Sequence, residues 1–234
     1  MSERENLFRP VHKGIRAMLY QLGRELQTTD FTDVPASNLV IDRLRSGLGD
    51  TASNCILCLL KDHSSHEERD LFAPLRRQDP DVVDLMMREH AEVSSRIGTV
   101  LRQCSELAQT TELPRRIELG DRLNEEANDL FAYYLTHLNR EESTIVPVMW
   151  ERFTDDQLRE LRARFYDAVP LARFETWMRW TLPAMNANEL TVLFRGLKNG
   201  PPSERFADWV RLAHETLEPG RWKELADRIP LSLP

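Results

Sequence analysis

The sequence predicts an all-α protein in which an up-down-up-down four-helix bundle is followed by a smaller helical C-terminal subdomain. Apolar residues recur at helical spacing almost throughout the chain, and no stretch alternates convincingly in the manner of a β-strand. The 234 residues are 41% hydrophobic and 29% charged, with only 9 glycines, which is typical of a globular protein. Four long helical segments joined by short links favour an antiparallel bundle.

The four bundle helices follow one another along the first two thirds of the chain. They are expected over residues 7–27, 36–72, 81–108 and 115–144. Pro10 is tolerable in the opening turn of the first helix. Gly47 and Gly49 are expected to bend or break the second helix. The sequence RRQDP, ending at Pro80, reverses the chain before the third helix, and residues 110–114 link the third helix to the fourth.

After Trp150 the sequence predicts shorter helices that are divided by prolines. Four of the five tryptophans lie beyond this residue. The sequences TDDQ at 154–157 and NANE at 186–189 are capping-box patterns, which mark helix starts. The chain is therefore divided into a bundle domain over residues 1–151 and a helical C-terminal extension over residues 152–234.

Composition limits the partners and the location that we expect. The net charge of −7 and the pI of about 5.5 argue against nucleic acid or an anionic membrane surface as a partner. The first ten residues include no apolar core of a signal peptide, and no run of 18 apolar residues could span a bilayer. A cytoplasmic protein is expected.

Two stretches share one arrangement of histidine and glutamate. HSSHEE begins at His63 and HLNREE begins at His137, so that each histidine is followed four residues later by a glutamate, Glu67 or Glu141. Residues four apart lie on one face of a helix. On both helices this face is the apolar stripe, so each pair should point into the core of the bundle.

The other two bundle helices each carry one more histidine on an apolar stripe. His12 shares its stripe with Ile15 and Leu19, and His90 shares its stripe with Met86 and Ile97. Buried carboxylates and imidazoles are costly without a partner, and a divalent metal would satisfy all of them together. Imidazole and carboxylate without thiolate suit iron, manganese or zinc.

Each part of this set has a simpler interpretation when it is taken alone. A lone histidine on an apolar stripe is more often a hydrogen-bonded core residue, and a single pair of His and Glu four residues apart is more often a surface pair. Two matched pairs together with inward histidines on both remaining helices favour a shared metal site. His66 lies to one side of the His63 stripe and is expected to flank the site, and His214 is expected to be structural.

The three cysteines are expected to be reduced thiols, because their number is small and odd. Cys55 and Cys58 form a C-I-L-C sequence, but the chain has no second cysteine pair for zinc and no strand-to-helix context for a thioredoxin-like motif. By helical periodicity both point away from His63. A small apolar packing role is the preferred interpretation.

This set of residues resembles the hemerythrin-like family, also called HHE cation-binding domains. The resemblance covers about residues 7–150 and includes the apolar residues after each Glu-Glu pair, with Pro74 and Pro147 closely following. It implies a bundle around two non-haem irons, with Glu67 and Glu141 as bridging ligands. The terminal ligands that it implies are His12, His63, His90 and His137.

One position departs from the oxygen-carrying members of that family. They have a further histidine one turn after the histidine of the third helix, where this chain has Ser94. About one coordination position should therefore be open, which favours oxidation or sensing over reversible carriage. Tyr133 and Tyr134 border the ligand face, where core packing is preferred over a hydrogen bond to a bound oxygen species.

The resemblance leads us to expect a di-iron protein that binds O2 or a related small oxidant, NO or peroxide, for sensing or detoxification, rather than an enzyme. One alternative is a di-iron oxidase, peroxidase or oxygenase that acts on an organic substrate. Another is an iron-responsive protein-interaction module whose C-terminal helices contact a protein partner. Zinc or manganese stays open as the occupant.

Overall fold

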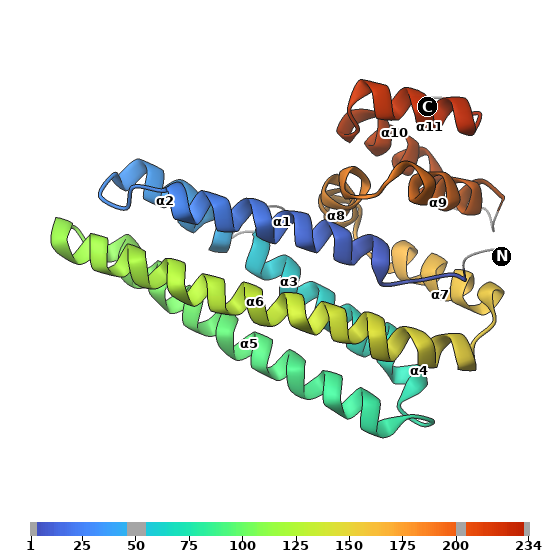
Figure 1. The fold of residues 1–234 in the computed structure, drawn as a ribbon, viewed down its shortest axis with the longest axis horizontal. Helices are drawn as coiled ribbons and strands as arrows, with labels where there is room; N and C mark the ends of the chain where they lie inside the picture. The colour runs from blue at the N-terminus through green and yellow to red at the C-terminus, as the bar shows by residue number, and fades with distance from the viewer. Residues whose placement is uncertain (1–3, 46–54, 200–204, 232–234) are drawn as a thin grey trace. The chain divides into compact units, whose positions relative to one another are not determined.

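The computed structural model describes residues 4–45, 55–199 and 205–231. The all-α class is confirmed, because these residues form helices and connecting turns and include no strand (Figure 1). In chain order the helices are α1 (Arg9–Thr28), α2 (Val34–Arg45), α3 (Ile56–His66), η2 (Glu67–Phe72), α4 (Ala73–Leu75), α5 (Pro80–Gln109), α6 (Leu113–Arg152), α7 (Asp155–Ala168), α8 (Leu171–Ala184), α9 (Ala187–Asn199), α10 (Phe206–Thr216) and α11 (Pro219–Arg228).

The chain forms two compact units. The bundle unit comprises Met18–Ile145, and the C-terminal unit comprises Val146–Pro234 together with Met1–Ala17. Helices α1 and α6 each run through a boundary between the units. The two units do not test the domain boundary predicted at residue 151, which stays a prediction.

The second and fourth predicted helices differ from the structure in their bounds. The second is divided into two helices, α2 and α3. Helix α3 then continues through η2 into α4. Gly47 and Gly49 lie outside the described residues. The fourth continues past residue 144 to Arg152 and includes Pro147. An internal proline removes one helical hydrogen bond, but Val146 and Met149 are buried, and their burial favours continuing the helix.

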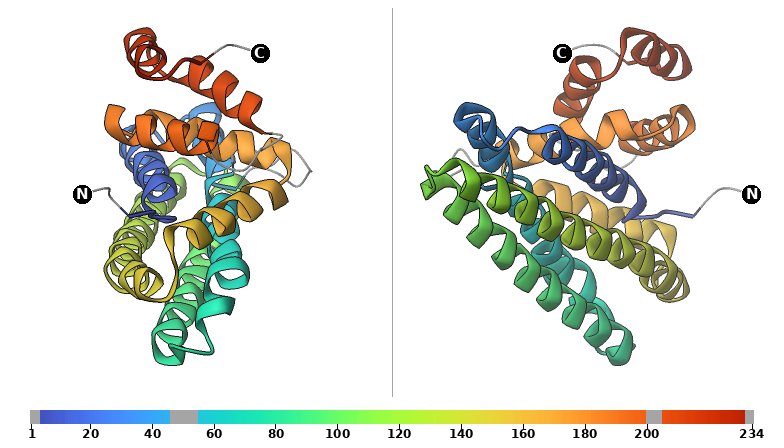
Figure 2. Two further views of the ribbon diagram at one scale, coloured as in Figure 1. Left: turned by 90° about the vertical axis from the view of Figure 1, so that its right-hand side faces the viewer. Right: turned by 60° about the vertical axis from the view of Figure 1, so that its left-hand side comes forward.

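The core of the bundle unit consists of apolar side chains from every long helix. Leu22 of α1, Ile41 of α2, Leu59 of α3, Ile97 of α5 and Leu130 of α6 are all fully buried. Helices α5 and α6 lie side by side in each view, joined by a short link (Figures 1 and 2). Burial of one apolar stripe per helix is the main force that holds such a bundle together.

A buried arginine closes the end of this bundle where α5 meets α6. Arg116 is 1% exposed, and its guanidinium donates hydrogen bonds to the carbonyls of Phe31, Leu107 and Thr110 and to the Ser37 hydroxyl, at 2.7–3.0 Å. Leu107 lies in the last turn of α5, where carbonyls lack helical partners and carry partial negative charge. The arginine satisfies those carbonyls and ties the 29–33 turn to both helices.

The C-terminal unit has an aromatic core of its own. Trp209 is 1% exposed, and its ring meets the edges of Tyr166, Phe174 and Phe194 at centroid distances of 5.0–6.4 Å. Helix α8 packs on α10, and α9 packs on α11. Both predicted capping boxes are confirmed, with Thr154 and Gln157 at the start of α7 and Asn186 and Glu189 at the start of α9.

The N-terminal segment is fixed within this unit by hydrogen bonds. Arg4 pairs with Asp155 at 3.1 Å and donates to the carbonyl of Phe153 at 2.7 Å. The indole N–H of Trp150 donates to the carbonyl of Glu5 at 2.8 Å. These contacts bring residues before α1 against the junction of α6 and α7.

Candidate metal centre

The first His-Glu pair lies where α3 passes into η2. His63 is in the last turn of α3, and Glu67 is the first residue of η2. His63 Nε2 lies 3.1 Å from Glu67 Oε1, and both side chains are buried. The predicted spacing of four residues thus places the two groups against each other inside the bundle unit.

The segment Glu67–Phe72 is a π-helix, in which each N–H bonds five residues back instead of four. This wider turn places two consecutive carboxylates beside one imidazole. Glu67 Oε2 lies 3.5 Å from His90 Nε2, and Glu68 Oε1 lies 2.9 Å from His90 Nδ1. At the other end of the turn, Phe72 stacks on the His90 ring with centroids 5.5 Å apart. The π-helix therefore positions three contacts to His90.

The second pair lies on α6 and has a similar arrangement. His137 Nε2 lies 3.2 Å from Glu141 Oε1, and both side chains are fully buried. On the opposite side of the ring, His137 Nδ1 lies 2.8 Å from Oε2 of Glu89, a buried residue of α5. Arg140 forms an ion pair with the other Glu89 oxygen. Arg140, Glu89 and His137 thus form a chain of contacts that leads from the surface to the site.

These contacts decide which ring nitrogens can bind a cation. Because Nδ1 of His90 and of His137 faces a carboxylate, it carries the proton and donates the hydrogen bond. In the neutral ring, Nε2 then carries a lone pair. The two Nε2 atoms are buried and make no hydrogen bond with any described residue. Their lone pairs are directed toward the carboxylates of Glu67 and Glu141.

Four of the groups form a cluster of metal-ligand type. One ligand atom each from Glu67, His90, His137 and Glu141 lies within 4.8 Å of the others, and all four residues are buried. His90 Nε2 is 3.5 Å from an oxygen of Glu67 and 3.5 Å from an oxygen of Glu141. Lone pairs and anionic oxygens at these distances repel one another unless a cation lies among them. Nitrogen and oxygen donors without thiolate fit a first-row divalent metal.

The charges of the cluster confirm its preference for positive charge. Burial and the neighbouring Glu67 raise the pKa of Glu141, but the nearby imidazoles of His137 and His90 outweigh them, so that the pKa lies below its usual value. Burial lowers the pKa of His90, yet the carboxylates of Glu141 and Glu67 raise it to about 10. The carboxylate of Glu141 therefore stays ionised and attracts either a proton or a metal cation.

His12 is the predicted ligand that lies outside the bundle unit. It belongs to Met1–Ala17, it is buried, and its ring meets the edge of Phe8 at 5.5 Å. Helix α1 is continuous, so His12 shares a stripe with Leu19 and Leu26, which are buried. Its participation in the centre stays a prediction.

The remaining candidate residues are not members of the cluster. His66 is partly exposed and contacts Arg69 at 2.7 Å, and His214 meets the Trp222 ring in the C-terminal unit. Ser94 is exposed, and the open coordination position expected from the absence of a histidine there stays a prediction. Tyr134 is fully buried and donates its hydroxyl to the carbonyl of Leu60 at 3.3 Å.

Sequence reasoning missed Glu68 and Glu89, the two carboxylates that orient the histidine rings. Each is the sequence neighbour of a predicted ligand, since Glu68 follows Glu67 and Glu89 precedes His90. Neighbours on an α-helix point about 100° apart, which argues against both facing one site. Glu68 can contact His90 because the π-helix widens the turn that carries it. Glu89 contacts His137 of α6 and not His90, its neighbour in the sequence.

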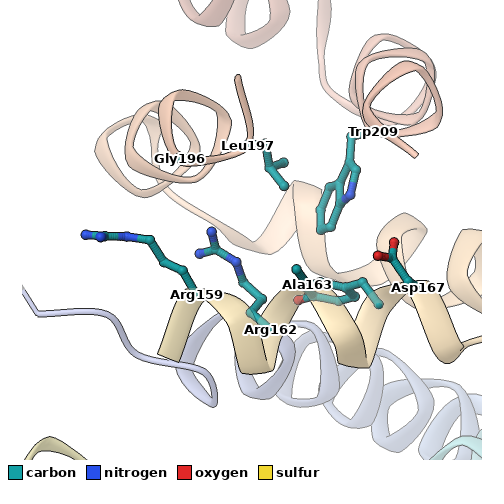
Figure 3. Close-up of a pocket in the computed structure, with 8 residues that line it drawn as sticks. Arg159, Arg162, Ala163, Asp167, Gly196, Leu197 and Trp209 are labelled. Carbon is teal, nitrogen blue, oxygen red and sulfur yellow. The ribbon is translucent and has the colours of Figure 1, made fainter. Parts of the chain in front are cut away.

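Hollows also lie outside the cluster. A surface groove of about 560 Å³ is lined by residues that include Glu68, Phe72 and Met87, and Phe72 separates it from His90. In the C-terminal unit, a pocket of about 30 Å³ lies between Arg162 of α7 and the side chains of Leu197 and Trp209 (Figure 3). Its volume suits a single water molecule.

Comparison with protein families identifies the class of this chain. Residues 5–149 match the hemerythrin HHE cation-binding domain, which is well over half of the sequence. The protein therefore belongs to the hemerythrin HHE cation-binding family, as the motifs predicted. Comparisons with curated proteins and with solved structures gave no match. Among the described residues, no helix combines the length and the apolarity needed to cross a bilayer.

Proposed function

We propose that the chain holds a non-haem di-iron centre that binds O2 or a related small oxidant, NO or peroxide, for sensing or detoxification. The observation that carries the proposal is the position of His90 Nε2, equally distant from carboxylates on two different helices. A cation held by His90 would therefore be within reach of both carboxylates. The proposed ligands are His12, His63, Glu67, His90, His137 and Glu141, with the two glutamates as bridges.

The protein's own side chains would prepare this centre for its ligands. Glu68 and Glu89 hold the protons on Nδ1 of His90 and His137, so that Nε2 faces inward without rotation of the ring. The rings of Phe72 and Tyr134 lie against these histidines at 5.5 and 5.8 Å and exclude water from them. Bound iron would supply electrons to a small oxidant.

Metal analysis and optical spectroscopy test this proposal. Protein purified without oxygen should contain about two irons per chain by the ligand count, and its absorption should change on exposure to air. His137→Ala should lose most of the iron, whereas His66→Ala, which removes a histidine outside the cluster, should retain it. A colourless protein that holds zinc, or equal metal content in the two variants, would contradict the proposal.

The groove beside Phe72 favours an enzyme as the second candidate, a di-iron oxidase, peroxidase or oxygenase. It brings solvent within one side chain of His90 and has room for an organic molecule. Steady turnover of peroxide or of an organic substrate by the iron-loaded protein would favour this candidate. A single stoichiometric reaction with the oxidant would favour a sensor.

A further inference from the structure

A disulfide stands at the beginning of α3, apart from the metal centre. Cys55 is the N-cap residue of this helix, and it is joined to Cys58, one turn further on, with Cα atoms 5.2 Å apart. Reduced thiols with a packing role were expected here, but these two cysteines are paired. Cys104, the third cysteine, is buried and free.

The two sulfurs of the pair differ in their access to solvent. Cys55 is 1% exposed, whereas Cys58 is partly exposed. Thiol–disulfide exchange requires an incoming thiolate to reach one of the sulfurs directly. An external thiol can therefore reach Cys58, and the buried Cys55 becomes the leaving group.

The start of α3 stabilises that leaving group. The backbone N–H of Cys58 donates to Cys55 Sγ at 3.1 Å, and the N-terminus of a helix carries partial positive charge. A stabilised thiolate leaves faster in exchange. The carbonyl of Leu44 lies 3.4 Å from Cys55 Sγ and accepts the S–H hydrogen bond once this thiol is protonated. The surroundings of Cys55 thus suit both its bonded and its reduced form.

We propose that Cys55 and Cys58 form a redox-active disulfide that a low-molecular-weight thiol reduces by attack on Cys58. In the first step the incoming thiolate bonds to Cys58 Sγ, the bond between the cysteines breaks, and its electron pair goes to Cys55. In the second step another thiolate attacks the outer sulfur of the mixed disulfide and releases Cys58. Two small thiols are thereby oxidised to one disulfide, and their two protons pass to Cys55 and Cys58.

A redox titration of the full-length protein tests whether the pair is active. The protein is equilibrated under nitrogen in buffers of graded reduced-to-oxidised glutathione ratio, quenched with acid, labelled with N-ethylmaleimide and examined by mass spectrometry. Cys55 and Cys58 should become labelled together in one two-electron transition. Cys104 is free, so this thiol should be labelled at every ratio once the acid has unfolded the protein, and it serves as an internal control. Both cysteines free at every ratio, or neither one reducible without denaturant, would overturn the proposal.

Two serine variants test which sulfur is attacked. With oxidised glutathione, Cys55→Ser should add one glutathione at Cys58 on the order of tenfold faster than Cys58→Ser adds one at Cys55, because only Cys58 is accessible. Circular dichroism checks that both variants keep the helical content of the wild type. Equal rates, or a faster reaction of Cys58→Ser, would contradict attack at Cys58.

Discussion

Single carboxylates decide how the histidines of the candidate centre can act. The ligand spacing was visible in the sequence because residues four apart share a helix face. The partners of the other ring nitrogens were not visible, because they depend on which helices face each other. Glu89 illustrates this difference, since it lies next to His90 in the sequence but contacts His137 of α6.

Glu89→Gln tests the orienting role of this carboxylate. The amide oxygen can still accept the Nδ1 proton of His137, but the negative charge and the ion pair with Arg140 are lost. Metal affinity should fall about 10- to 100-fold, as measured by competition with a chelator. Glu92→Gln is the control, because Glu92 lies on the same helix and pairs with Arg96 instead. Similar affinities of the two variants would show that Glu89 does not tune the site.

At the scale of elements, the structure adds two features to the predicted helices. Apolar periodicity predicted the four long helices. Their observed ends differ from the predicted ends where local contacts outweigh helix propensity. The π-helix over Glu67–Phe72 could not be predicted, because its bonds to the fifth residue back leave no distinct apolar pattern. The burial of Arg116 could not be predicted either, because its hydrogen-bond acceptors come from segments far apart in the sequence.

Arg116→Met should destabilise the bundle strongly. The substitution keeps apolar length but leaves the carbonyls of Phe31, Leu107 and Thr110 without their shared donor. The free energy of unfolding should fall by about 2–4 kcal/mol, which urea denaturation followed by circular dichroism measures. The adjacent Arg115→Met is the control: Arg115 is partly exposed and pairs with Glu106 and Glu118, so it should lose less than about 1 kcal/mol. Equal losses would contradict the structural role of Arg116.

Two glycine substitutions test how closely the turn before α2 packs on α6. A methyl group at Gly120 would lie 2.3 Å from the Phe31 ring, so Gly120→Ala forces the ring to move. The unfolding free energy should fall by about 1–3 kcal/mol. At Gly98 of α5 the nearest atom is 3.7 Å away, in the flexible Arg102 side chain. Gly98→Ala should therefore gain up to about 1 kcal/mol from helix propensity. A neutral Gly120→Ala would show that Phe31 does not pack against α6.

At the scale of the whole molecule, the chain has one unit whose apolar core includes a cluster of buried ionisable groups and one unit whose core is aromatic. The bundle unit buries ionised carboxylates that need a cation, whereas the C-terminal unit is held by the aromatic cluster around Trp209. The sequence predicted the ligand motifs of the bundle, and it placed four of the five tryptophans beyond residue 150 without predicting that they form a core. It could not predict that residues before α1 join the C-terminal unit, because that contact links residues about 150 positions apart.

Removal of the metal should therefore affect the two units differently. A ligand that binds only the folded state stabilises it by about 2.7 kcal/mol at a concentration 100 times the Kd, so a chelator should remove stabilisation of that order from the bundle unit. Without the cation, the buried carboxylates of Glu67 and Glu141 repel each other, and η2 and the middle of α5 should open more often.

Hydrogen exchange measured by mass spectrometry, with and without chelator, should show faster exchange in peptides that cover residues 56–75 and 86–94. Peptides from α8 and α10 should exchange at the same rate in both conditions, because neither of these helices carries a proposed ligand. Equal acceleration in both units would mean that the metal stabilises the chain as a whole, and no change in either would remove the structural case for a buried cation site.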